Sequence, residues 1–226
     1  MNNYEKFKVV RPIPPDYQKD TYGIPIIKKQ DFSCDWNDIK YASLSNLKST
    51  KERERTILSN FQYDSTLMRL WNNPENYISK FKEFYAILSP DFSVYTNMEH
   101  AQIIHNVFMN RWLGCFWQYL GVNIIPTISW GDNSTYDICF SGVEKESIVA
   151  ISTVGISKNH KEFIEGFHEL IKRINPPLII VRGNYVKGMT GNLLFFSFEE
   201  TFNINKAYEQ LSFQDIPRTI YIGGDL

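Results

Sequence analysis

An apolar segment that ends in a carboxylate between two hydroxyls is the part of this sequence best suited to chemistry. Residues 84–88 have the composition of a short buried strand, and Ser89-Pro90-Asp91-Phe92-Ser93 follows at once. Open α/β sheets and α/β barrels build their ligand sites from polar side chains at the carboxyl ends of strands. We therefore expect Ser89, Asp91 and Ser93 to line a pocket, in which Asp91 is a candidate catalytic residue.

Another apolar segment ends in a second carboxylate. Asp64 follows residues 57–63, which also have the composition of a strand, and it is the other candidate catalytic residue. Two carboxylates at one edge of a sheet could act as an acid/base pair or bind a divalent cation. The sequence identifies no cofactor, but Mg²⁺ or Mn²⁺ held by Asp64 and Asp91 is one candidate.

Three further regions supply candidate ligand-binding residues. Trp130 ends another predicted strand and Asp132 follows it, and the indole could stack on a ligand ring. The loop that contains Thr153 and Gly155 joins a strand to a helix, so it could present backbone amides to an anion. Arg111, on a long predicted helix, could reach a carboxylate at the same edge.

Several of these residues also have a purely structural interpretation. Asp91 could satisfy the backbone amides of its own turn, and Asp64 could cap the helix that follows. Gly155 could serve only to permit a tight turn. Residues 183–190 superficially resemble a phosphate-binding loop, but Met189 stands where such a loop needs a lysine, so we reject that interpretation.

Apolar segments alternate with amphipathic ones along most of the chain. Continuous apolar strands separated by helices predict an α/β fold with a mostly parallel sheet and helices on both of its faces. The pattern leaves open whether the sheet is open or forms a small or incomplete barrel. We expect strands at about residues 57–63, 84–88, 122–130, 148–152, 178–181 and 193–198.

The longest predicted helix begins near residue 96 and ends before Gly121. Thr96 and Glu99 have the spacing of a capping box, and Gly121 stands where a left-handed cap belongs. In the strand that follows, Pro126 lacks an amide hydrogen, which indicates a bulge or a sheet edge.

The composition is that of an ordinary globular protein. Of 226 residues, 43% are hydrophobic and 22% are charged, and the formal net charge is -1. This charge provides no overall attraction for nucleic acid. The most basic segment, residues 48–55, has Glu52 and Glu54 between its cations, which favours a solvated surface over a nucleic-acid site.

We expect a cytoplasmic protein made of one α/β domain and an arm. The three cysteines are widely spaced, no apolar segment approaches the length of a membrane span, and the amino terminus lacks the apolar core of a signal peptide. Residues 1–30 are proline-rich in part and predict an extended arm, and residues 31–226 predict the domain. We expect no contact with a membrane.

Four short motifs occur in order between residues 89 and 155. They are SPDFS at 89–93, NRWLG at 110–114, IPTISW at 125–130 and AISTVG at 150–155. This series resembles a family of uncharacterised proteins encoded by phages, plasmids and integrated elements of mainly Gram-positive bacteria. The resemblance covers about residues 20–185. It implies a mobile-element setting, where accessory proteins often serve replication or counter host defence, and it implies no established activity.

Three functions are open at this point, and so is the question of whether the protein is an enzyme. The leading hypothesis is a phage or mobile-element accessory protein that binds a small polar ligand, with a nucleotide as one candidate, at the carboxyl edge of its sheet. Metal-assisted hydrolysis of that ligand would extend this hypothesis. The alternatives are a non-enzymatic protein that acts on a host factor of defence or replication, and a nucleic-acid-binding protein of element replication.

Overall fold

The first four strands form one parallel sheet. The computed structural model describes residues 10–156, 160–197 and 219–222. The first sheet contains β1 (Lys40–Ser43), β2 (Thr56–Ser59), β3 (Ala86–Leu88) and β4 (Ile124–Ile125), in chain order and all parallel. Each successive strand is therefore added to the same edge of the sheet.

The remaining strands form a second sheet, again in chain order. In this sheet β5 (Val149–Ser152), β6 (Ile179–Arg182) and β7 (Gly191–Phe196) are parallel, and β8 (Thr219–Ile222) pairs with β7 in the antiparallel direction. All the described parallel strands consequently have their carboxyl ends at a common edge of their sheet.

Residues 126–128 join the two sheets. The amide of Ala150 on β5 donates to the Pro126 carbonyl at 2.9 Å, and the Ile128 amide donates to the Ala150 carbonyl at 2.8 Å. The chain thus leaves its partner β3 at Pro126 and pairs with β5 instead. The long strand expected around this proline is accordingly reduced to the two residues of β4 and a short bridge.

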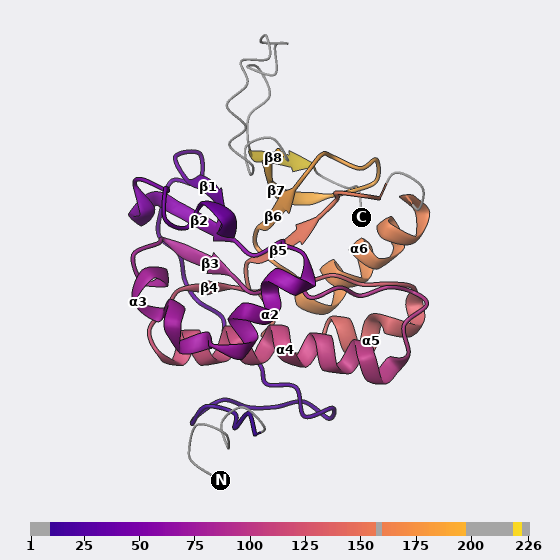
Figure 1. Ribbon diagram of the computed structural model, residues 1–226. Coiled ribbons are helices and arrows are strands. Elements are labelled where there is room, and N and C mark those ends of the chain that lie inside the picture. Colours follow the sequence, from indigo (N-terminus) through magenta and orange to yellow (C-terminus); the bar gives the residue numbers. More distant parts are fainter. Residues whose placement is uncertain (1–9, 157–159, 198–218, 223–226) are drawn as a thin grey trace.

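Helices connect the strands and lie outside them. Figure 1 shows α4 and α5 below the strands and α6 beside the second sheet. Short 3-10 turns complete the connections. The described helices are α2 (Asp64–Asn72), α3 (Ile78–Phe81), α4 (His100–Tyr119), α5 (Tyr136–Cys139) and α6 (His160–Ile174), and the 3-10 turns are η1 (Leu44–Asn46), η2 (Arg53–Arg55), η3 (Pro74–Tyr77) and η4 (Asn133–Thr135).

The inner faces of the two sheets share one apolar core. The rings of Tyr41 on β1 and Phe196 on β7 stack across this core with centroids 4.5 Å apart. These two strands face each other without pairing, so the described strands do not close into a barrel. Every described parallel strand contributes to this inner core, through Tyr41, Ile57, Ala86, Leu88, Ile125, Ala150, Ile180, Leu194 and Phe196.

The outer faces of the sheets pack against the helices. Leu58 on β2 belongs to a cluster with Leu67 of α2 and Trp112 of α4, and Ile151 on β5 belongs to a cluster with Phe167 of α6. Side chains alternate between the inner and outer faces along each strand. The predicted mostly parallel α/β fold is confirmed, and its strands are arranged so that one face of each sheet is enclosed.

The described part of the predicted arm, residues 10–30, contains no helix and packs on the domain. Ile24 and Ile27 are completely buried, and Ile27 forms a parallel bridge with Val143. The guanidinium of Arg11 lies over the ring of Trp71 at 4.4 Å. Burial of these side chains ties the segment to the outer surface of the helices.

The start of α4 differs from the prediction. The capping box expected at Thr96 is wrong, because the helix begins at His100, where Glu99 is the cap and pairs with Gln102 in a capping box. Residues 95–98 form a turn instead, closed by the Met98 amide and the Tyr95 carbonyl at 3.1 Å. The predicted helix end is confirmed, because Gly121 follows the last residues with φ of 84°.

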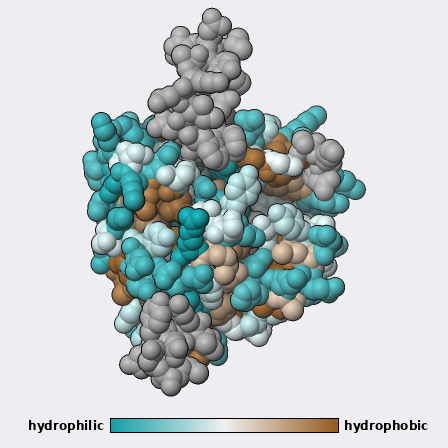
Figure 2. Space-filling view, viewed as in Figure 1, coloured by the Kyte–Doolittle hydropathy of each residue, from teal (hydrophilic) through white to brown (hydrophobic). Residues whose placement is uncertain are grey.

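The described surface is mainly polar on the face drawn in Figure 2, with smaller hydrophobic areas between the hydrophilic side chains. Among the helices of the described ranges, none combines the length and the apolar character that crossing a membrane requires.

Candidate functional site

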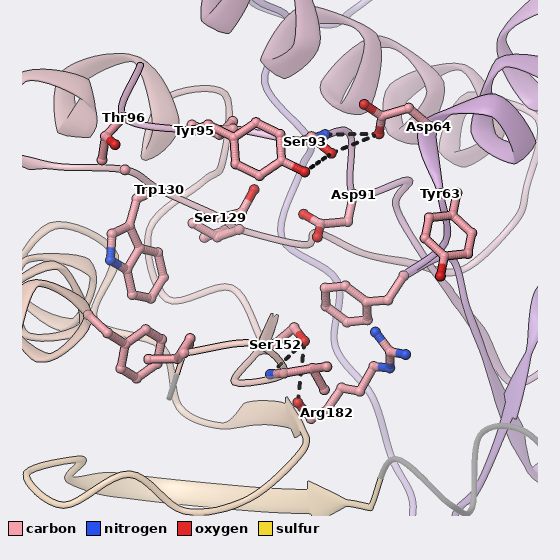
Figure 3. Close-up of a pocket in the computed structure, with 18 of the residues that line it drawn as sticks. Tyr63, Asp64, Asp91, Ser93, Tyr95, Thr96, Ser129, Trp130, Ser152 and Arg182 are labelled. Atoms are coloured by element: carbon pink, nitrogen blue, oxygen red, sulfur yellow. Dashed lines mark hydrogen bonds between the residues drawn. The ribbon is translucent and has the colours of Figure 1, made fainter. Parts of the chain in front are cut away.

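A large cavity opens at the carboxyl ends of β2 to β6. Its volume is about 1230 Å³, which exceeds the roughly 300–1000 Å³ of ordinary small-molecule sites. Its wall contains Asp64 and Asp91 from the first half of the chain and Arg182 from the second (Figure 3). The cavity therefore lies at the edge where the sequence predicts ligand-binding side chains.

The alternation of side chains along β5 and β6 explains two of the lining residues. Ala150 and Ile180 point into the inner core, so Ser152 and Arg182, two positions later, face the same side at the strand ends. The cavity is thus the open end of the space between the inner faces of the sheets.

Asp91 brings a buried carboxyl group to the cavity wall. Its Oδ1 atom has no hydrogen-bond partner among the described residues, although the Ser129 hydroxyl hydrogen-bonds to the carboxyl group. Burial raises the pKa of Asp91 to about 6, against the opposing effects of Ser129 and of the nearby cations Arg111 and Arg182. A buried acceptor of this kind can bind a hydrogen-bond donor of a ligand.

Asp64 is already hydrogen-bonded within the wall. As the first residue of α2, it accepts bonds from the Ser93 amide at 3.1 Å and from the Ser93 hydroxyl at 3.2 Å. The Tyr95 hydroxyl in turn donates to Ser93 Oγ at 3.3 Å, and Asn106 of α4 donates to the Ser93 carbonyl at 2.7 Å. Asp64 therefore fixes a loop of the cavity, whereas Asp91 retains an unused oxygen.

An aromatic pair forms another part of the wall. The rings of Trp130 and Phe163 stack with centroids 5.2 Å apart and planes 19° apart. The indole lies directly against α6, because a Cβ atom built at Gly166 would come within 2.0 Å of Trp130 Nε1. The glycine in the middle of this helix is what leaves room for the indole.

Replacing Gly166 with alanine is expected to displace Trp130 and to destabilise the protein by about 1–3 kcal/mol, the usual cost of overpacking. Alanine elsewhere in a helix would instead stabilise it by roughly 0.5–1 kcal/mol. Urea denaturation measures the loss of stability in Gly166→Ala, and tryptophan fluorescence measures the displacement of Trp130. Shortening the ring with Trp130→Phe in the Gly166→Ala background should recover part of the loss, and a fully stable single variant would contradict the packing account.

Ser89 and Arg111 lie outside the cavity lining, in a buried polar cluster behind it. The Ser89 hydroxyl donates to Asn110 Oδ1 at 2.7 Å and accepts a hydrogen bond from the Thr127 amide at 2.8 Å. Arg111 donates to Asn110 Oδ1 and to the carbonyls of Thr127, Cys139 and Ser141 at 2.7 to 3.0 Å. Their contacts position the segment that continues to Ser129 and Trp130.

Asp132 and Thr153 also lie outside the lining, next to residues that belong to it. Asp132 Oδ1 accepts from the Ser134 amide at 3.0 Å and so caps η4. The Thr153 hydroxyl donates to the Asn184 carbonyl at 2.8 Å. Gly155 lines the cavity with φ of 90°, a conformation that glycine adopts without strain.

The cavity therefore combines five predicted residues with several that the sequence reasoning missed. Asp64, Asp91, Ser93, Trp130 and Gly155 belong to the lining. The missed residues have a common signal, since they stand at or shortly after the end of a strand and lie on its inner side or in the loop beyond it. They include Tyr63, Tyr95, Ser129, Ser152 and Arg182.

Metal and nucleic-acid binding remain predictions. In the parts of the chain that the structure describes, no group of three or more His, Cys, Asp or Glu side chains is placed to hold a metal ion. In the basic segment at 48–55, Arg53 pairs with Glu83, and Arg55 pairs with Asp38 at 3.4 Å. These pairs leave less of the positive charge available to a phosphate backbone.

Comparisons with known proteins place the chain among phage proteins. Residues 17–199 match the model of a family described as a domain of unknown function (DUF4417). The Gene 1 protein of Mycobacterium phage L5 is 36% identical over 169 residues, which cover 72% of this chain and 71% of that protein. The Gene 1 protein of Mycobacterium phage D29 is 32% identical over 150 residues, which cover 63% and 56% respectively.

No solved structure matches the chain significantly. The predicted resemblance to an uncharacterised phage-encoded family is confirmed by the two phage relatives and by a family match that spans most of the sequence. The chain belongs to the family described as a domain of unknown function, DUF4417.

Proposed function

We propose that this protein binds a small polar ligand in the cavity at the carboxyl ends of β2 to β6. The observation that carries the proposal is the buried carboxyl group of Asp91, a residue that lines a cavity of about 1230 Å³ and whose Oδ1 atom no described residue satisfies. An unsatisfied buried acceptor costs about 1–3 kcal/mol. A ligand that donates a hydrogen bond to this atom removes the cost. Ligand binding would therefore explain why the protein keeps a buried carboxyl group here.

The groups around Asp91 suit a polar ligand that contains a ring. Ser129 and Ser152 supply hydroxyls, Arg182 supplies a cation, and Trp130 supplies an aromatic surface within the same lining. Ligand sites commonly combine apolar walls with a few converging polar groups of this kind. The same surroundings leave room for a planar or cyclic ligand between the polar and the aromatic parts of the wall.

Turnover of the ligand would use Asp91 as the proton-transferring group. Its pKa of about 6 lies close to neutral pH, and general acid/base catalysis is most efficient when the pKa lies near the working pH. Asp64 would then serve to position the loop that contains Ser93. Binding is the proposal, and catalysis is its extension.

Thermal melting of the full chain tests the proposal. The panel contains nucleosides, nucleotides, cyclic dinucleotides, glycosides, Mg²⁺ and Mn²⁺. A ligand at ~100 times its dissociation constant adds ~2.7 kcal/mol to the free energy of unfolding, which gives a clear rise in Tm. We expect at least one compound to raise Tm for the native protein and to lose that effect in the Asp91→Asn variant.

Asp38→Asn is the matched control. The Asp38→Asn substitution removes the same charge as Asp91→Asn. Asp38, however, precedes β1 at the amino edge of the first sheet and pairs with Arg55 on the surface. This variant should keep the full rise in Tm. Ligand effects that survive in Asp91→Asn would place binding elsewhere, and a panel without any effect on the native protein would favour a protein partner over a small ligand.

A further inference from the structure

The charged side chains in the cavity wall are mainly carboxylates. Asp64, Asp91 and Glu162 are acidic, and Arg182 is the only lysine or arginine among the described lining residues. Asp64 and Asp91 are partly buried, where like charges repel each other more strongly than in bulk water, and the exposed Glu162 adds a repulsion that is strongest at low salt. The wall therefore opposes the entry of a group with two negative charges, such as a phosphate monoester.

Carboxylates also occupy the helix N-termini around the cavity. Asp64 is the first residue of α2, Glu99 caps α4, and Glu162 lies in the first turn of α6. A helix N-terminus attracts anions through its dipole and its free amides. In these three helices the protein's own carboxylates supply that negative charge, which weakens the usual site for a phosphate.

The single arginine lies close enough to the buried carboxylate for the two charges to interact. Arg182 and Asp91 attract each other electrostatically, and the guanidinium lies 5.8 Å from the centroid of the Phe61 ring. Its charge therefore offsets part of the negative charge of Asp91, and the wall keeps an excess of carboxylates. Figure 3 shows the two side chains in opposite parts of the wall.

The mouth of the cavity exposes large apolar side chains. Tyr63 is 85% exposed, Tyr95 is 59% exposed and Val154 is 43% exposed, and all three belong to the lining. Trp130 and Phe163 form an aromatic wall further along the same surface. Aromatic faces bind flat heterocycles and the apolar faces of sugars, and exposed apolar groups collected at one opening indicate a binding surface.

We infer that the cavity accepts an uncharged, ring-containing ligand whose N–H or O–H groups donate to Asp91, and that it discriminates against phosphorylated forms of the same ligand. Nucleosides and glycosides share this chemistry. The inference rests on the proposed function and adds the class of compound that the site selects. It follows from the acidic wall, the capped helix N-termini and the aromatic mouth taken together.

Isothermal titration of the full chain tests the selection with matched pairs. Each nucleoside is compared with its 5′-monophosphate and triphosphate, and each methyl glycoside is compared with the corresponding sugar phosphate. At low salt we expect the uncharged member of a pair to bind at least about tenfold more tightly. The two sets of compounds also decide which source, nucleoside or glycoside, supplies the ring.

A charge variant distinguishes electrostatic repulsion of the phosphate from its poor steric fit as the cause of the discrimination. Glu162→Gln removes one negative charge from the wall and should reduce the discrimination several-fold by strengthening the binding of the phosphorylated member. Glu165→Gln is the matched control, because Glu165 lies on the same helix, pairs with Lys161 and is outside the lining. It should leave the ratio unchanged.

Each outcome has a definite meaning. Phosphorylated compounds that bind as tightly as their parents, or more tightly, would overturn the inference while leaving ligand binding at the cavity intact. A ratio unchanged by Glu162→Gln would overturn the electrostatic basis of the inference. Failure of the nucleosides and glycosides, with and without phosphate, to bind the native protein would overturn the inference, whereas the proposed function fails only if the whole melting panel leaves Tm unchanged.

Discussion

Replacing Arg111 with methionine is expected to destabilise the protein by more than about 3 kcal/mol, the largest loss we predict for a single side chain. The buried guanidinium donates to the carbonyls of Thr127, Cys139 and Ser141, which no methionine can satisfy. Arg111→Lys should also be strongly destabilising, because an ammonium group cannot reproduce the planar arrangement of these donors.

Urea denaturation measures the loss, and Arg173→Met provides the control. Arg173 pairs with Asp137 and Glu169 on the exposed side of α6, and pairs of this kind contribute about 0–1 kcal/mol. A loss of unfolding free energy in Arg111→Met as small as that in the control would contradict the role assigned to Arg111. Denaturation at a reduced temperature keeps the comparison possible if the variant is only marginally folded.

The expected effect on the site follows from the same contacts. Arg111 and Asn110 hold the segment at Thr127, two residues before Ser129 and three before Trp130. The sequence predicted that Arg111 would contact the ligand site, and the structure places it behind the wall. Its influence on binding would therefore pass through the position of the chain and not through contact with a ligand.

The edge on which the cavity lies could be predicted from the sequence, because polar residues follow each apolar strand. The choice between neighbouring residues required a second rule. Leu88 faces the inner core, so the alternation of side chains directs Ser89 outward to α4 and Asp91 inward to the cavity. The same alternation separates Ser152, which lines the cavity, from Thr153, which does not.

Other features depend on contacts between distant parts of the chain. The change of partner at Pro126 shifts the alternation, so Thr127 packs with Ser89 on the outer side although Ile125 belongs to the inner core. Pro126 indicates a bulge or a sheet edge in the sequence, but it does not tell which strand the chain pairs with next. The inward direction of Arg182 likewise depends on β6 lying next to β5, where Ile180 and Ala150 are in register.

Asp91→Asn should increase the stability of the protein at neutral and alkaline pH. Burial raises the pKa of Asp91 from its ordinary value of 3.8 to about 6, which means that the fold disfavours the charged form. The native protein therefore loses stability as the pH rises from about 4 to about 6, and the loss is complete above that range. A change of this size corresponds to on the order of 3 kcal/mol.

Asparagine has the same shape and no charge, so the variant should not show this loss. We expect chemical denaturation at pH 4 to 8 to give a free-energy difference between variant and native protein that grows between about pH 4 and 6 and is constant above. Taking the difference removes the contributions of other titrating groups, provided that their surroundings are unchanged. A difference independent of pH would mean that Asp91 is charged at little cost. A difference that grows as predicted would mean that the carboxylate in the cavity wall lowers the stability of the fold. Such a loss of stability is expected of a residue that is retained for binding or catalysis and not for folding.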